Sequence, residues 1–273
     1  MLSGESGSRA RLKRDTRPAR LQGPAHRLSA AVNPVGMIIC LAVLLLLPGA
    51  GRAEPGYAQD RRDMVESIAR MHGRHPVPAA GSIDKQVLQA LRRVPRHEFV
   101  PEEHTDKAYA NRPLPIGHGQ TISQPYIVAL MTDLLQIEPT DTVFELGTGS
   151  GYQAAVLSHL AAEVHTLEII PELAESAARR LDRLGYDNVH VSQGDGYHGL
   201  EQEAPFEAII VTAAAGHIPP PLVRQLKEGG RMVIPVGQPF LTQQLTLVTK
   251  DSQGSLRIRH LLPVSFVPLT GGH

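Results

Sequence analysis

The chain has 273 residues, 42% of them hydrophobic, and its 27 basic and 27 acidic residues cancel to a formal charge of zero at pH 7. This apolar content can form a buried core of single-domain size, which excludes a wholly disordered chain. The single cysteine, Cys40, excludes a disulfide framework and a cysteine-based metal centre in the rest of the chain. The thirteen histidines form no HExxH or comparable ligand set, so the sequence predicts no metal site.

The N-terminal leader, residues 1–53, differs in character from everything after it. Residues 1–36 are basic, contain several Gly, Ser and Pro and lack an apolar period, so we expect them to be disordered. Eleven consecutive apolar residues follow at 37–47, with Pro48-Gly49 after them and small residues at 51 and 53. This order is typical of a secretory signal, and the apolar run is too short for a comfortable transmembrane helix. A signal anchor and a misplaced start are the alternatives.

The charge of the remaining chain bears on the kind of partner. Beyond residue 53 there are 19 basic and 25 acidic residues, a formal charge of −6, and no basic stripe is apparent. Nucleic-acid binding usually requires a positive surface that displaces counterions from phosphates. The charge therefore disfavours DNA or RNA as a partner.

The folded part is expected to begin with a helix capped by Ser82 and ended by Pro95. Its apolar residues share one face: Val87, Leu88, Leu91 and Val94. The chain then reads VPRHEFVP at 94–101 and PLPIGHGQTISQP at 113–125.

A second helix is expected after Pro125. Its apolar side carries Ile127, Leu130, Met131, Leu134 and Leu135. Ser123 stands just before this helix, and serine is among the most favoured N-cap residues. Its position alone therefore favours a capping role over a catalytic one, although one residue can serve both.

Residues 142–157 have the pattern of a strand, a tight glycine turn and the start of a helix, with the turn reading Glu145-Leu-Gly147-Thr-Gly149-Ser-Gly151. Glycine tolerates positive φ and lets the backbone approach a ligand closely. The spacing is G-x-G-x-G rather than the dinucleotide pattern G-x-G-x-x-G, and an acid stands two places before the first glycine. Both features favour S-adenosylmethionine, which has no pyrophosphate to bind at a helix N-terminus. An ordinary glycine-rich turn is the alternative.

Strands and helices alternate beyond this turn. Four further strands are expected at 162–168, 189–193, 206–212 and 230–236. A helix that follows Pro221 and is stopped by Gly229-Gly230 should precede the last of these strands. Such alternation is typical of an open, mostly parallel sheet with helices on both faces. Ligands of these sheets bind at the carboxyl ends of the strands. Glu168 should therefore accept hydrogen bonds from ribose hydroxyls, Asp195 should meet the adenine amino group, and the loop from Thr212 should lie beside them.

Together these segments resemble the protein-L-isoaspartate (D-aspartate) O-methyltransferase family over roughly residues 60 to 270. The shared motifs are VPRxxFV, PLPIGHGQTISQP, ELGTGSGYQ, GDG, IIVTAA, LKEGGRMVIPVG and the terminal FVPL at 266–269. PLPIGHGQTISQP is the most specific, because methyltransferases in general share only the glycine loop and the acids after it. Tyr197 stands where a tryptophan is common after GDG, and the leader is outside the family pattern.

The resemblance implies an α/β fold, a Rossmann-like class I methyltransferase with a mostly parallel, doubly wound sheet. Residues 54–273 would form the methyltransferase domain, with a substrate-side helical extension at 54–138 and the cofactor-binding sheet at 139–273. The sheet would end in antiparallel strands, 245–248 against 256–262.

The resemblance also implies the activity: S-adenosylmethionine-dependent methyl esterification of the free α-carboxylate of L-isoaspartyl and D-aspartyl residues in damaged proteins, which initiates their repair. A carboxylate with a pKa near ~4 is ionised at neutral pH and needs no general base. Catalysis is then mostly positioning, and Ser123 becomes the residue that orients the acceptor. The implied substrate residues are Thr121, Ile122, Ser123 and Val267, and the implied cofactor residues are Glu145, Gly147, Thr148, Gly149, Gly151, Glu168, Asp195 and Thr212.

The expected partners are isoaspartyl-containing proteins and peptides, with no nucleic acid and with membrane contact only through an unprocessed apolar segment. We expect a monomer, located in the cytoplasm where the cofactor is made; export or anchoring through residues 37–53 is the alternative. Other functions stay open: a class I methyltransferase acting on another small carboxylate or on nucleic acid, an NAD oxidoreductase, or a non-catalytic Rossmann-type binding module. The glycine spacing disfavours NAD, and the intact substrate segment disfavours a non-catalytic module.

Overall fold

The computed structural model describes residues 54–75, 77 and 80–271, which belong to one compact unit. The predicted disorder of residues 1–36 and the predicted signal at 37–53 lie outside the described residues. Among the described helices, none combines the length and the apolar character needed to cross a membrane.

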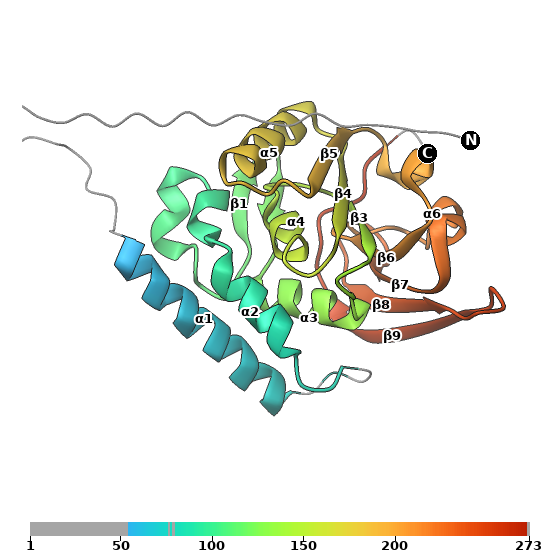
Figure 1. The fold of residues 1–273 in the computed structure, drawn as a ribbon, viewed down its shortest axis with the longest axis horizontal. Coiled ribbons are helices and arrows are strands. Elements are labelled where there is room, and N and C mark those ends of the chain that lie inside the picture. Colours follow the sequence, from blue (N-terminus) through green and yellow to red (C-terminus); the bar gives the residue numbers. More distant parts are fainter. Residues whose placement is uncertain (1–53, 76, 78–79, 272–273) are drawn as a thin grey trace, which may run out of the picture. The chain divides into compact units, whose positions relative to one another are not determined.

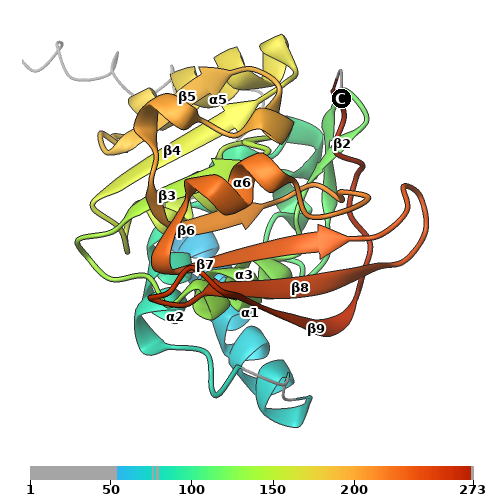
Figure 2. The same cartoon turned by 90° about the vertical axis from the view of Figure 1, so that its right-hand side faces the viewer.

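A seven-stranded sheet forms the centre of this unit (Figures 1 and 2), with the spatial order β5-β4-β3-β6-β7-β8-β9. The first five strands in this order are parallel, and β8 and β9 continue the sheet antiparallel. The strands are β3 (Thr142–Leu146), β4 (Glu163–Glu168), β5 (Val189–Gln193), β6 (Phe206–Val211), β7 (Leu226–Val236), β8 (Gln243–Lys250) and β9 (Leu256–Val264). The predicted doubly wound sheet with its antiparallel end is confirmed.

Both faces of the sheet are buried, because successive side chains of a strand point to opposite faces. Val143 of β3 and Ile210 of β6 belong to one apolar cluster. Their neighbours Phe144 and Ile209 belong to the other. One cluster contains residues of α1 (Glu54–Arg74), α2 (Lys85–Arg93), α3 (Pro125–Leu135), α4 (Tyr152–Leu157) and α5 (Pro171–Arg183), and the other contains residues of α6 (Pro220–Gln225). Figure 2 shows α6 in front of the sheet and α1 to α3 behind it.

The end of α6 departs from the prediction. The helix stops at Gln225 instead of reaching Gly229, and β7 begins at Leu226. Leu226 pairs with Phe206 of β6, so its apolar side chain belongs to the sheet and not to the helix. The apolar spacing of this segment fits a helix locally, but strand pairing across the sheet decides the boundary.

The N-terminal extension consists of α1 and α2, the short 3₁₀ helices η1 (Arg96–Phe99) and η2 (Glu102–Lys107), and the antiparallel pair β1 (Leu114–Gly117) and β2 (Gln120–Ile122). The predicted cap Ser82 is wrong. Asp84 caps α2, because its carboxylate accepts a 2.6 Å hydrogen bond from Gln86 N, while its own N–H donates to Asp133 of α3 at 2.7 Å. This second contact explains why Asp84 and not Ser82 is the cap, since Asp84 also attaches α2 to α3.

Residues 54–273 are expected to fold and to methylate substrate without the leader, because the described core clusters consist of residues from Met64 onward. The 54–273 fragment should show the same melting temperature as the full chain, within about 2 °C. Its initial rate with an isoaspartyl peptide should also match. A fragment that is folded but inactive would contradict this expectation.

Candidate active site

A pocket lies at the carboxyl ends of β3, β4 and β6, where ligands of open parallel sheets bind. The lining comes from both parts of the fold: residues 120–123, 145–150, 152–153, 167–170, 212–213 and 267–270, with Val128 and Gly196. The pocket therefore joins the predicted cofactor loop to the predicted substrate segment.

Gly147 and Thr212 fit together at the base of this pocket. Gly147 has a φ of 99°, and a Cβ at this position would clash with Thr212 Oγ1. The Thr212 hydroxyl faces the carbonyl oxygen of Gly147 at 2.6 Å and that of Leu146 at 3.0 Å, and it donates to them. Thr212 thus fixes the first turn of the glycine loop, which explains why only glycine fits there.

Glu168 holds the second turn of the loop. Its Oε2 accepts a 2.8 Å hydrogen bond from Gly149 N, and its Oε1 accepts a 3.0 Å bond from Ile170 N. The side chain is only 6% exposed and borders the pocket. Each carboxylate oxygen has a further lone pair, so Glu168 keeps acceptor capacity for ribose hydroxyls.

Gly151 has a different role from the other two glycines. It is the N-cap of α4, with a φ of 86°, and it is not among the residues that line the pocket. A Cβ here would lie 3.1 Å from Leu181 Cδ1 of α5. This glycine therefore serves the packing of α4 against α5, and its predicted place beside the cofactor stays a prediction.

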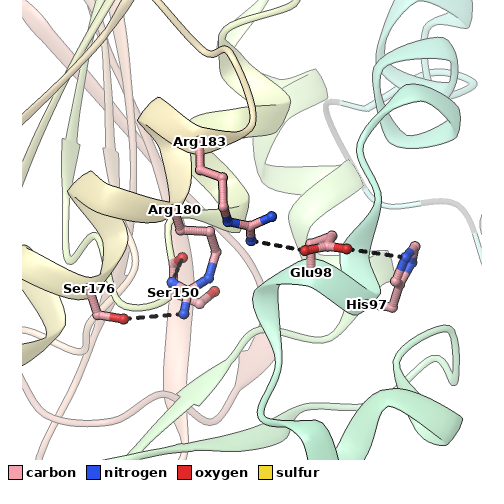
Figure 3. Close-up of polar contacts among 6 residues, drawn as sticks. All are labelled: His97, Glu98, Ser150, Ser176, Arg180 and Arg183. Atoms are coloured by element: carbon pink, nitrogen blue, oxygen red, sulfur yellow. Dashed lines mark hydrogen bonds and ion pairs between the residues drawn. The ribbon is translucent and has the colours of Figure 1, made fainter. Parts of the chain in front are cut away.

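Helix α5 supports the glycine loop from outside the pocket (Figure 3). Arg180 Nη1 donates to the carbonyl oxygen of Ser150 at 2.9 Å, and its Nη2 donates to Ser176 Oγ at 3.2 Å. Burial, together with the nearby Arg183, lowers the pKa of Arg180. One turn further on, Arg183 forms a 2.9 Å ion pair with Glu98 of η1. The same helix thus connects the cofactor loop to the N-terminal extension.

Glu145 is fully buried at the pocket wall. Its Oε2 accepts a 2.7 Å hydrogen bond from Thr166 Oγ1, which also contacts Thr148 Oγ1 at 2.7 Å. Burial, with a smaller contribution from the neighbouring Glu168, raises the pKa of Glu145 to about 8, although the hydrogen bond from Thr166 opposes this shift. At neutral pH the carboxyl is therefore mostly protonated. A cation bound beside it would favour its ionised form.

Asp195 does not border this pocket. Its Oδ1 accepts a 3.0 Å hydrogen bond from Tyr197 N and caps the short helix η3 (Gly196–His198). The neighbouring Gly196 lines the pocket instead, and a Cβ on it would overlap the side chain of Leu146. The predicted contact of Asp195 with the adenine amino group stays a prediction, and Gly196 was not predicted. The signal was present, since a second glycine directly after the acid indicates a close backbone approach.

The predicted substrate residues Thr121, Ile122, Ser123 and Val267 all border the pocket. A second cavity shares Thr121, Ser123 and Val267 with it. Val267 is held there because its carbonyl oxygen accepts a 2.8 Å hydrogen bond from Ala214 N. The C-terminal segment is thereby fastened to the loop that follows β6.

Ser123 is not the cap of α3. The helix begins at Pro125, its N-cap is Gln124, and the cap makes no side-chain hydrogen bond to the helix. The capping interpretation of Ser123 is therefore wrong. Its half-buried side chain instead borders both cavities.

Other pocket residues were not predicted. Gln153 borders the pocket and donates to Thr132 Oγ1 at 2.9 Å, and Ile169, Ile170 and residues 268–270 complete the wall. The two isoleucines directly follow the acid of β4, a position that places them at the ligand-binding edge. Within the described part of the chain, no group of three or more His, Cys, Asp or Glu side chains could hold a metal ion.

The raised pKa of Glu145 predicts a pH-dependent stability. The folded protein binds this proton more tightly than the unfolded chain, so the free energy of unfolding should fall as the pH rises from about 4.5 to about 8. Glu145→Gln removes this loss and should be more stable than the parent at pH 8, by on the order of 3 kcal/mol. Urea unfolding of both proteins at pH 5 and pH 8 measures the difference, with Glu228→Gln on the surface as the control. An equal advantage at both pH values would contradict the assignment.

The comparisons with known proteins agree with this geometry. The family model described as "Protein-L-isoaspartate(D-aspartate) O-methyltransferase (PCMT)" matches residues 78–273. Protein-L-isoaspartate O-methyltransferase 2 of Syntrophobacter fumaroxidans is 58% identical, covering 85% of this chain and 96% of its own. Protein-L-isoaspartate O-methyltransferase 1 of Cupriavidus necator is 53% identical, covering 94% of this chain and 98% of its own.

Solved structures extend the likeness to the fold. A protein-L-isoaspartate O-methyltransferase is 28% identical with a TM-score of 0.69, over 77% of this chain and 66% of that one. A putative Plasmodium falciparum enzyme of the same name, crystallised with S-adenosyl-L-homocysteine, is 26% identical with a TM-score of 0.64, over 77% of this chain and 98% of that one. With a family model spanning most of the described residues and relatives above half identity along nearly the whole sequence, this chain belongs to the protein-L-isoaspartate(D-aspartate) O-methyltransferase family.

Proposed function

We propose that this chain transfers the methyl group of S-adenosylmethionine to the free α-carboxylate of L-isoaspartyl, and also D-aspartyl, residues in damaged proteins and peptides. The single observation that supports this most is that one pocket is bordered by both the glycine loop with Glu168 and the segment 121–123. Family membership supplies the substrate class and argues against the NAD-dependent and non-catalytic alternatives.

The cofactor side of the pocket is formed by the sheet, within residues 139–273. Glu168 would bind the ribose hydroxyls, and the backbone of Gly147 and Gly149 would pass close to the ligand. Thr148 and Thr212 would act indirectly, since their hydroxyls bond to Thr166 and to the loop carbonyls. The cofactor supplies an electrophilic methyl group on a cationic sulfur. Its positive charge suits the buried Glu145 beside it, which would ionise more readily.

The acceptor side is formed by the extension, residues 54–138, together with Val267. Methyl transfer breaks a carbon–sulfur bond and forms a carbon–oxygen bond, and the acceptor oxygen provides the electron pair. Because the carboxylate is already ionised at neutral pH, no residue has to remove a proton. The protein's contribution is to hold the oxygen in line with the methyl group, an effect that can reach roughly 7–11 kcal/mol. Ser123 would orient the carboxylate by donating a hydrogen bond to it from the side-chain hydroxyl.

A pair of variants tests both halves of the site. Ser123→Ala should lower kcat for an isoaspartyl peptide about 10- to 100-fold, as expected for one hydrogen bond to a charged group. Its calorimetric affinity for S-adenosylhomocysteine should not change. Glu168→Ala should instead act on the cofactor, weakening the binding of S-adenosylhomocysteine by about 1–3 kcal/mol.

The same assay should compare the isoaspartyl peptide with its normal aspartyl twin, which the parent protein should leave unmethylated. Full turnover by Ser123→Ala would remove the proposed role of the serine. Unchanged cofactor affinity in Glu168→Ala would remove the proposed ribose site. Methylation of both peptides at equal rates would contradict the substrate class itself.

We further infer that the protein works as a monomer in the cytoplasm, where its cofactor is made. The competing inference, export or anchoring through residues 37–53, rests on the signal-like pattern of the sequence. N-terminal sequencing of protein isolated from its host should find no cleavage near Ala53, and cell fractionation should recover the activity with cytoplasmic enzymes. A mature chain that begins at Glu54 would overturn the cytoplasmic assignment.

A further inference from the structure

We propose that Arg96 is a positioning residue for methyl transfer, whose buried guanidinium fixes the backbone of Ser123 and couples it to the helix that follows the glycine loop. The proposal rests on the role of Ser123 given above and deepens it. Arg96 belongs to the VPRxxFV segment, for which the sequence indicated no chemical role, and it is not among the residues that line the pocket.

The contacts of Arg96 reach two separate stretches of the extension. Its Nη2 donates to the carbonyl oxygen of Ser123 at 2.7 Å, and its Nε donates to the carbonyl oxygen of Ala108 at 2.8 Å. Hydrogen bonds from a charged donor are shorter and stronger than neutral ones. The planar guanidinium sets the relative direction of its donors, so the two carbonyls are held in a fixed relation to each other.

A third contact reaches the cofactor side. The guanidinium carbon of Arg96 lies 4.6 Å from the centre of the Tyr152 ring, within the range of a cation–π interaction. Tyr152 is the first residue of α4, directly after Gly151, and it borders the pocket. One side chain therefore contacts both the acceptor segment and the start of the helix behind the glycine loop.

Burial makes this arrangement difficult to distort. Arg96 is 0% exposed, and the partners described for it are two neutral carbonyls and an aromatic ring rather than a carboxylate. Burial lowers the pKa of Arg96 to about 10, so the group remains a cation at neutral pH. If the Ser123 carbonyl turned away, a desolvated charge would lose a partner, which is strongly unfavourable. The backbone that carries the Ser123 hydroxyl is thus restrained from behind the pocket.

The 3₁₀ helix η1 that carries Arg96 is also held from its outer side. Glu98 pairs with Arg183 of α5, the helix whose Arg180 supports the glycine loop through Ser150 (Figure 3). Arg96 therefore projects from an element that is itself anchored to the cofactor half. A displacement of the Ser123 backbone relative to the glycine loop would disturb these contacts.

The test is a double-mutant cycle in the full-length protein, with an isoaspartyl peptide as the acceptor. Arg96→Lys keeps the positive charge but cannot reproduce the fixed pair of bonds to two carbonyls. It should lower kcat at least about tenfold while KM and the affinity for S-adenosylhomocysteine stay within about threefold. In the Ser123→Ala background the same substitution should change kcat less than about twofold, because it acts through the serine hydroxyl.

The controls separate this proposal from a general loss of structure and from the proposed function. Arg92→Lys, on the exposed side of α2, should behave like the parent protein. If Arg96→Lys does not fold, Arg96→Gln takes its place, since it carries no buried charge and can still donate to one carbonyl.

Each outcome of the cycle decides one question. Equal losses of kcat in both backgrounds, or parent-like kcat in the single Arg96 variant, would overturn the positioning role while leaving the activity intact. A parent protein that does not methylate the isoaspartyl peptide would instead overturn the proposed function. A Ser123→Ala variant with full turnover would remove the serine on which this proposal rests.

Discussion

Two hydrogen bonds to the carboxylate of Glu168, one from Gly149 N and one from Ile170 N, set the shape of the pocket. They join the turn after β3 to the turn after β4, so the two neighbouring strand ends carry one continuous wall. Gly149 adopts a φ of 53°, a conformation that an L side chain rarely takes, and its N–H points at the acid as a result. Without this carboxylate the second turn of the glycine loop would lose its bond to β4, while the first turn would keep the 2.8 Å bond from Gly147 N to the carbonyl oxygen of Leu167.

Two buried ionisable groups, Glu145 and Arg96, have different surroundings on the two sides of the pocket. Glu145 lies against the sheet, where burial favours its neutral form and makes it sensitive to a cation nearby. Arg96 lies behind the acceptor segment, where its charge faces two backbone carbonyls and an aromatic ring, and where its Nη1 is buried without a hydrogen-bond partner among the described residues. The surroundings of Glu145 suit the binding of a cationic cofactor. Those of Arg96 suit a backbone segment that has to stay in one conformation. This division agrees with a reaction in which alignment matters more than proton transfer.

Much of the fold follows from local pattern. Apolar runs predict the strands, and proline and glycine predict several helix boundaries. The acid at the end of β4 is predicted to lie at the ligand-binding edge because the carboxyl ends of parallel strands share one edge, and Glu168 does border the pocket. Local pattern fails where two readings compete. The segment after Pro221 has helical spacing, yet Leu226 joins β7 because Phe206 of the neighbouring strand pairs with it. Ser82 and Asp84 are both good caps, and the contact with Asp133 of α3 selects Asp84.

The sequence by itself determined the parallel sheet, its antiparallel end, the glycine loop, the acid that follows it and the family. It did so because these features depend on residues close together in the chain and on motifs with fixed spacing. Only the tertiary structure decided which way individual side chains face. Gly151 faces α5, Asp195 caps η3, and Ser123 borders the pocket instead of capping α3. The role inferred for Arg96 belongs to the same class, since its partners come from three segments that are brought together only by folding.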